Sequence, residues 1–150
     1  MSDRPRGDNE VKQEIARKIG DVFDAAVNRK HGENAGMNES YATIGDVEAD
    51  RIQIATGLNV HGYSHSISRH EILHALGRHG KGSGDPRPIT KEDFAKLHEI
   101  IITADEIIHD GPTHIGLPAI TYKKRINGYT VIVEEMRGKK TQAVGLQDNV

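Results

Sequence analysis

The sequence contains no cysteine, no tryptophan and no long apolar run. Without cysteine the chain forms no disulfide and offers no thiolate ligand, so histidine and carboxylate alone would have to hold any transition metal. No segment approaches the roughly 18 apolar residues of a membrane span, and the first ten residues lack the apolar core of a signal peptide. We therefore expect a soluble protein with no membrane segment.

Aromatic residues are also scarce, with four Tyr and two Phe among 150 residues. With 35% hydrophobic residues, a chain of this length supports one modest core. The net charge of −2 gives no overall reason to expect a nucleic-acid partner. Residues 61–91, however, hold five Arg or Lys, only two acidic residues and five of the nine histidines. This segment predicts a local cationic patch.

Hydrophobic spacing predicts the elements of the first half of the chain. Residues 10–30 carry apolar side chains at helical spacing, and the polar, glycine-containing stretch that follows indicates a loop. We place a boundary near Ser40, which gives an N-terminal helix and linker over 1–40 and the main domain over 41–150. Within that domain we expect a short strand at 41–45 and a helix with Asp46 as N-cap and Gly57 just past its end.

The second half is expected to change from helices to strands. A histidine-rich helix should begin near Ser66 or Ser68 and end at or just after Gly77, and a helix over 89–108 should open on a capping box of Thr90 and Asp93. Three β-rich runs follow, over 114–125, 129–136 and 141–146, joined by turn sequences. The predicted class is α+β, with helices packed on a small antiparallel sheet.

Residues 70–80, HEILHALGRHG, contain the HExxH pattern of zinc peptidases. His70 and His74 would share one helix face, with Glu71 beside them as the base. In the longer form of the motif a third histidine falls at the position that is Gly80 here, whereas the available histidine is His79. Glu92 or Glu99 could complete the site instead, so a zinc peptidase with His70 and His74 as ligands stays an alternative.

The same residues, taken with their flanks, resemble a known family. A histidine after a Gly-Tyr pair, a helix ending in His-Gly, an "IT.ED" helix start and a "YKKRING" hairpin leading to an acidic strand end occur in this order. Over about residues 41–146 this order resembles the phage-associated nuclease domains of the barnase, EndoU, colicin and RelE-like fold. The resemblance implies an α+β fold that cleaves RNA without a metal or other cofactor, on its concave face.

The resemblance also implies site residues. His65, His74 and His79 match the family's histidine positions, whereas His70 matches none. The C-terminal run TQAVGLQDNV departs from the Thr- and Tyr-bearing final strand of such domains. A domain that docks to a phage head protein or to nucleic acid without catalysing a reaction is therefore a further alternative.

Cleavage of this kind needs a base for the 2′-hydroxyl, an acid for the leaving 5′-oxygen and a cation near the phosphate. We expect His74 and His79 to be the acid–base pair, in either order, because imidazole ordinarily titrates near neutral pH. Glu135 could act as a base or orient a histidine; strand alternation allows only one of Glu134 and Glu135 to face the site. The other expected site residues are His65 and Arg137 in catalysis, and Lys123, Arg125, Arg78 and Tyr63 in substrate binding.

The expected partners follow from this activity. RNA is the expected substrate, and a producing cell would need a cognate, acidic inhibitor protein that covers the cationic face. The chain could form part of a larger phage or toxin polypeptide, located in the cytoplasm of a bacterial host cell or in a phage particle.

Overall fold

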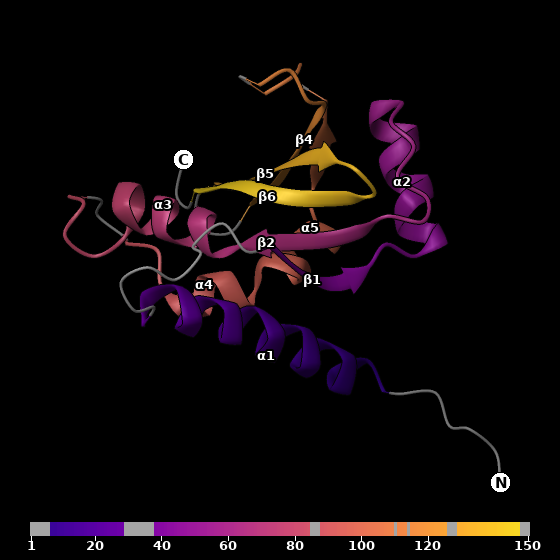
Figure 1. Ribbon diagram of the computed structural model, residues 1–150. Helices are drawn as coiled ribbons and strands as arrows, with labels where there is room; N and C mark the ends of the chain where they lie inside the picture. Colours follow the sequence, from indigo (N-terminus) through magenta and orange to yellow (C-terminus); the bar gives the residue numbers. More distant parts are fainter. Residues whose placement is uncertain are drawn as a thin grey trace, which may run out of the picture.

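The computed structural model describes residues 7–28, 38–84, 88–109, 111–113, 115–125 and 129–147. Five helices and one six-stranded sheet make up this part of the chain (Figure 1). In chain order the elements are α1 (Asp8–Val27), β1 (Asn38–Thr43), α2 (Asp46–Thr56), β2 (Ser64–Ser68), α3 (Arg69–His79), α4 (Lys91–Ala95), α5 (Leu97–Ile102), β3 (Glu106–Ile108), β4 (Ala119–Arg125), β5 (Tyr129–Arg137) and β6 (Lys140–Gln147).

The strands lie in the order β1-β2-β6-β5-β4-β3. The predicted antiparallel meander is confirmed, since β4 pairs with β5 and β5 with β6 in antiparallel register. The sheet as a whole is mixed, because β2 pairs with β6 in parallel. The α+β class is therefore confirmed, and the expectation of a wholly antiparallel sheet is wrong at this one pair.

The sequence predicts that a helix begins near Ser66 or Ser68, whereas residues 64–68 form strand β2. Its sequence, SHSIS, has only one apolar residue, yet four of its five residues are buried because β1 and β6 flank it. The Ser66 hydroxyl donates to the Thr141 carbonyl at 3.1 Å. Ser68 caps α3, accepting a hydrogen bond from the Glu71 backbone N–H. Hydrogen bonding inside the sheet thus permits a strand that apolar patterning does not reveal.

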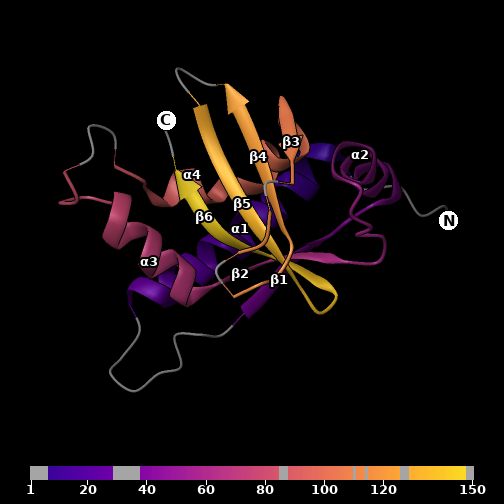
Figure 2. The ribbon, with the colours of Figure 1, turned by 90° about the horizontal axis from the view of Figure 1, so that it is seen from above.

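Helices α1, α4 and α5 lie on one side of the sheet, and strands β4 to β6 are free of helices on the other side (Figures 1 and 2). The core fills the space between these helices and the sheet, with Ile19, Leu97, Ile101, Ile120 and Ile132 among its fully buried residues. Helix α3 lies at the edge, packed against β6 and α1. We call the side without helices over β4 to β6 the open face.

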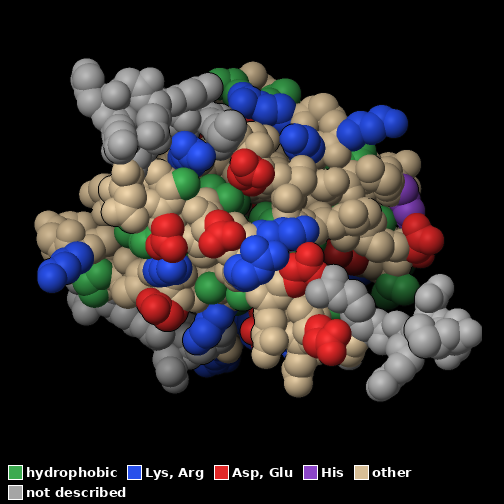
Figure 3. Space-filling view, turned by 60° about the horizontal axis from the view of Figure 1, so that its bottom comes forward, with side chains coloured by type: hydrophobic (Ala, Val, Ile, Leu, Met, Phe, Trp, Pro, Cys, Tyr) green, Lys and Arg blue, Asp and Glu red, His purple; other side chains and the backbone are tan. Residues whose placement is uncertain are grey.

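The expected N-terminal helix is α1, which begins at Asp8 and ends at Val27. It buries Ile15, Ile19, Val22 and Ala26 in the same core as the rest of the chain. The boundary proposed near Ser40 falls inside β1, while the linker of 29–37 lies outside the described residues. On the face seen in Figure 3, Lys and Arg alternate with Asp and Glu; the ion pairs Arg17–Asp21 and Lys91–Asp24, of 3.4 and 2.9 Å, belong to α1 and its neighbour α4.

Some helices begin or end at other residues than the sequence predicts, and others agree with the prediction. Gly45, not Asp46, is the N-cap of α2, while Gly57 ends the helix in the left-handed conformation, with φ of 79°. Helix α3 continues past Gly77 to His79. The capping box of Thr90 and Asp93 is confirmed.

The helix expected over 89–108 is divided. It consists of α4 and α5, which meet at Lys96, and residues 106–108 form the edge strand β3 on β4. No helix of the described part of the chain is long and apolar enough to cross a membrane.

Candidate active site on the open face of the sheet

Strand β5 carries alternating side chains to the two faces of the sheet. Tyr122 of β4 pairs with Ile132, and both are fully buried against the helices. Because the side chains of a strand alternate, Val131, Val133, Glu135 and Arg137 point to the open face. Glu134 points inward and is 0% exposed. The structure therefore answers which of the two glutamates can reach a ligand on the open face.

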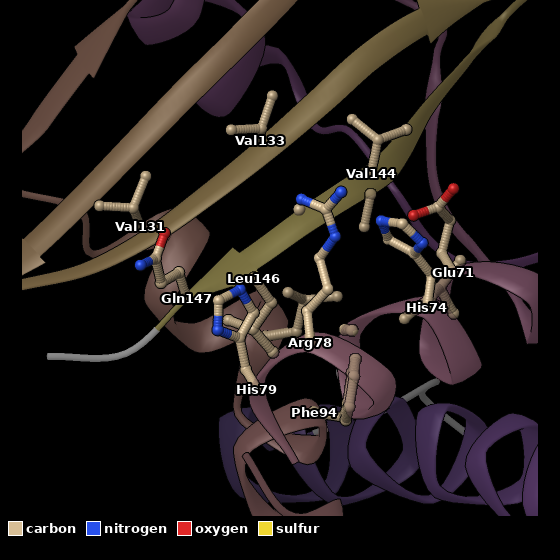
Figure 4. Close-up of a pocket in the computed structure, with 15 residues that line it drawn as sticks. Glu71, His74, Arg78, His79, Phe94, Val131, Val133, Val144, Leu146 and Gln147 are labelled. Carbon is tan, nitrogen blue, oxygen red and sulfur yellow. The ribbon is translucent and has the colours of Figure 1, made fainter. Parts of the chain in front are cut away.

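Helix α3 brings a second set of polar groups to this face. Glu71, His74 and Arg78 occur at i, i+3 and i+7, so they form one stripe along the helix. Ser68 fixes the start of the helix by accepting from the Glu71 N–H at 3.1 Å, and Ile72 and Ala75 are buried on the other side. In Figure 4 the guanidinium of Arg78 extends from the helix toward Val133 and Val144 of the sheet.

The two sets of side chains meet in a hollow of about 630 Å³. Glu71, His74 and Arg78 line it from α3, and Glu135 and Arg137 line it from β5. Its volume lies within the roughly 300–1,000 Å³ typical of ligand pockets. The hollow thus holds groups that can donate and accept protons beside two guanidinium groups that can bind an anion. Further lining residues are Ser68, His70, Thr113, Ile115, Gln142 and Val144.

Glu135 and Arg137 occupy the same face of β5 and form an ion pair, with 3.4 Å between Arg137 Nε and Glu135 Oε1. The Glu135 side chain is 5% exposed and that of Arg137 is 52% exposed. The carboxylate is thus held in place at the floor of the hollow, while the guanidinium extends to where a phosphate can reach it.

Glu71 is the carboxyl group whose protonation the hollow alters. Its burial raises the pKa above the ordinary glutamate value, His74 and His70 act to lower it, Glu135 raises it and Arg137 lowers it. The net shift is upward because desolvation disfavours the charged form. Glu71 therefore holds a proton more readily than an exposed glutamate does.

A second, more apolar pocket adjoins the hollow between α3 and the sheet. Val131, Val133 and Leu146 contribute apolar walls, while His79 and Gln147 lie side by side at one end (Figure 4). His74 and Arg78 line both pockets, whereas His79 lines only this one. The predicted partners His74 and His79 are five residues apart on α3, which places them about 140° apart around the helix. The structure brings His74, not His79, into the hollow with Glu135.

His65 lies behind the sheet, away from both pockets. It is 0% exposed, its Nδ1 lies 2.8 Å from Glu134 Oε2 and its Nε2 contacts Glu48. Burial acts to lower its pKa, but Glu134 and Glu48 outweigh burial and raise the pKa to about 10. His65 is therefore a buried cation with no surface for a substrate, so the catalytic contact expected of it is not possible in this structure.

Three expected substrate-binding residues lie outside the hollow. By strand alternation, Lys123 and Arg125 of β4 belong to the open face. They pair with Val131 and Tyr129, however, at the opposite end of β5 from Arg137. Tyr63 is half-buried against the core, and its carbonyl accepts from the Ile44 N–H at 2.9 Å. Of the expected substrate-binding residues, only Arg78 lines the hollow.

Glu71, Gln142 and Thr113 are among the lining residues that the nuclease interpretation of the sequence did not include. Glu71 was assigned only to the zinc alternative, although its spacing from His74 and Arg78 was visible. Gln142 pairs with Glu135 across β5 and β6, and Thr113 comes from the segment before β4. Neither could be found without the strand register.

The zinc alternative lacks a third ligand in the described part of the chain. The rings of His70 and His74 are stacked with centroids 6.3 Å apart. Among the described residues, one group of three histidine or acidic side chains could share a metal ion. It consists of Glu48, His65 and His98, and it contains neither His70 nor His74. Neither Glu92 nor Glu99 lines the hollow.

The chain thus combines a mixed sheet backed by helices with carboxylate, imidazole and guanidinium groups on the open face. The model of one protein family, described as phage-Barnase-EndoU-ColicinE5/D-RelE like nuclease3, matches residues 42–145. The chain belongs to this family, and it is a nuclease of the barnase/EndoU type. No curated protein and no solved structure gives a significant match.

Proposed function

We propose that the chain is a metal-independent endoribonuclease. The observation that carries this proposal is the convergence of Glu135 and Arg137 from β5 with His74 and Arg78 from α3 in one hollow. A base, an acid and cations for the phosphate are the parts that cleavage by a neighbouring 2′-hydroxyl requires. A DNA substrate has no 2′-hydroxyl to act as the internal nucleophile, so its cleavage would need an activated water instead.

In the proposed reaction Glu135 takes the proton of the 2′-hydroxyl, and the 2′-oxygen forms a bond to phosphorus. The bond between phosphorus and the 5′-oxygen breaks, and His74 donates a proton to that oxygen. The products are a 2′,3′-cyclic phosphate and a free 5′-hydroxyl. Arg137 and Arg78 stabilise the charge that grows on the phosphate in the transition state.

Glu71 and His79 have supporting parts in this proposal. Glu71 lies one helical turn before His74 on the same stripe of α3, and the two side chains interact electrostatically. His79 and Gln147 line the adjoining pocket, where apolar walls can accept a base and the amide of Gln147 can bond its edge. His79 is thus assigned to substrate binding rather than to proton transfer.

The non-catalytic docking alternative was suggested by the unusual C-terminal sequence. Residues 141–147 of that sequence nevertheless belong to a strand, β6, which pairs along β5 and β2 and lines both pockets. Although this sequence departs from the family pattern, its strand still forms part of the wall of both pockets. We therefore favour an enzyme over a non-catalytic docking domain. We also propose that RNA binds the open face, and that a cognate acidic inhibitor covers the same face.

The test uses two matched oligonucleotides that differ at one position. The first is an all-RNA strand, and the second carries a single 2′-deoxynucleotide at the position where the first is cut. The proposal predicts cleavage of the RNA strand and loss of cleavage at the deoxy position, because the nucleophile is missing there. Equal cleavage of both strands would contradict the proposal and indicate attack by water.

A further inference from the structure

A second cluster of titratable side chains lies behind the sheet, apart from the proposed active site. Glu48 from α2, His65 from β2 and His98 from α5 each offer one ligand atom, and these atoms all lie within 4.8 Å of one another. The rings of His65 and His98 meet edge to face, with centroids 5.3 Å apart. Three elements that are distant in the sequence therefore converge on one point.

His65 is oriented as a metal-binding histidine is. Its Nδ1 lies 2.8 Å from Glu134 Oε2, and Glu134 also accepts hydrogen bonds from the hydroxyls of Tyr122 at 2.8 Å and Thr141 at 3.1 Å. A carboxylate on one ring nitrogen fixes the ring and leaves the other nitrogen to a ligand, as in many zinc sites. The other nitrogen, Nε2, faces Glu48.

Two polar atoms beside His65 have no hydrogen-bond partner among the described residues. They are Nε2 of His98 and the hydroxyl of Tyr41, both without exposed surface. The Tyr41 ring is stacked on His65 and lies edge to face with His98, at 5.9 Å in each case. An unsatisfied buried polar atom is costly, so a ligand that engages them is favoured.

Acidic side chains lie on both ring nitrogens of His65. Glu134 contacts its Nδ1 and Glu48 contacts its Nε2, and Glu134 is fully buried. A divalent cation between Glu48, His65 and His98 would pair with these acidic groups in a place where negative charge is costly unless it is compensated.

We propose that Glu48, His65 and His98 bind a divalent transition metal ion of the zinc type. Two imidazoles and one carboxylate are a zinc ligand set, and the Tyr41 hydroxyl or a water supplies the fourth position. Bonds of about 2.0–2.1 Å to a metal would replace the direct contact between His65 Nε2 and Glu48 and bring His98 into the same shell. The Glu48 side chain, 18% exposed, provides the route from solvent.

The role of such a metal is structural. It would join α2, β2 and α5 behind the sheet, while the hollow with Glu135 lies on the open face.

The first test is metal content. Tag-free protein is stripped with chelator, dialysed against zinc at near-neutral pH and analysed for bound metal and for its melting temperature. We expect about one zinc per chain and a raised melting temperature for the wild type and for His109→Ala. His98→Ala should lose both the bound zinc and the rise in melting temperature. Its zinc affinity should fall by more than the roughly 10–100-fold that is typical when a residue outside the ligand shell is lost. His98 Nε2 has no partner to lose among the described residues, so this variant should still fold.

The second test separates this site from the HExxH helix and from surface histidines. His70→Ala should bind zinc like the wild type, and Glu48→Gln should not. No binding by the wild type, equal binding by His98→Ala, or loss of binding in His70→Ala would each overturn the proposal, whatever the outcome of the RNA cleavage experiments.

Discussion

Glu134 and Glu135 are neighbours in the sequence but belong to opposite sides of the sheet. Glu134 is 0% exposed and accepts hydrogen bonds from His65, Tyr122 and Thr141, whereas Glu135 pairs with Arg137 in the hollow of the open face. One β-strand therefore supplies a carboxylate to the interior and another to the proposed active site. The two residues are matched probes of stability and catalysis.

The first prediction contrasts these two glutamates. Glu135→Gln should slow RNA cleavage by about a hundredfold or more, since it removes a general base, and should change the stability little. Glu134→Gln should lower the free energy of unfolding by about 3–5 kcal/mol, because it removes one of the two carboxylates that pair with the buried His65 cation. Cleavage assays at saturating substrate and urea unfolding of both variants measure the two effects. The reverse pattern would show that Glu134, and not Glu135, is the carboxylate of the active site.

The second prediction concerns the stability of the metal-free protein at alkaline pH. Glu134 and Glu48, against the effect of burial, raise the folded pKa of His65 to about 10, above the unfolded value of about 6.5. A raised folded pKa means that His65 stabilises the fold fully below about pH 6.5, and that this contribution is lost as the pH rises through about 10. Urea unfolding in chelator should show this decline.

The protonation state can be observed directly. The groups around His65 that titrate or carry charge are Glu48, Glu134, His98, Tyr41 and Tyr122, and the pKa of both tyrosines is raised by burial and by Glu134. The imidazole resonances of His65 should therefore remain those of an imidazolium at about pH 8. A neutral imidazole at that pH in the stripped protein would contradict the arrangement.

The third prediction ranks the histidines of α3. His74→Ala should lower kcat by about a hundredfold or more, as loss of a general acid does. His79→Ala should mainly raise KM, because His79 lies in the adjoining pocket, and His70→Ala should have the smallest effect. Steady-state kinetics of the three alanine variants test the order. A larger loss in kcat for His79→Ala than for His74→Ala would restore the pair predicted from the sequence.

The fourth prediction concerns the cations of the open face. Arg137→Ala should lower kcat more than Arg137→Lys, since a lysine keeps the charge without the two-pronged geometry. Lys123→Ala, on β4 beside the other end of β5, should weaken RNA binding modestly and reduce its salt dependence without changing kcat. Binding and turnover measured across a series of salt concentrations separate the two roles. A loss in kcat for Lys123→Ala equal to that for Arg137→Ala would contradict the placement of the site.

The sequence predicted most helices and the three C-terminal strands, because their signals are local. The Thr90–Asp93 capping box, the helical spacing of α1 and the alternation in 129–136 each lie within one element. The sequence did not predict β2 or β3. The polar side chains of β2 are satisfied only by distant partners such as Thr141, and a single apolar run covered both α5 and β3.

The site shows the same division. His74, Arg78, Glu135 and Arg137 were identified from the sequence, and they line one hollow. His65 was assigned to catalysis because it is a histidine beside the right motif, but its burial depends on Glu48 and Glu134, which lie 17 and 69 residues away. Long-range register decides which face a side chain meets, and no local pattern contains it.

The chemistry of the RNA ends formed in excess chelator tests the central claim most directly. Wild-type protein is incubated with a defined RNA in chelator, at a temperature well below melting, beside the variants His74→Ala, Glu135→Gln and Lys123→Ala. We expect the wild type and Lys123→Ala to leave 2′,3′-cyclic phosphate and 5′-hydroxyl ends, with cleavage lost in the other two variants. Cleavage that stops in chelator while the protein stays folded, or that leaves 5′-phosphate ends, would contradict a metal-independent ribonuclease.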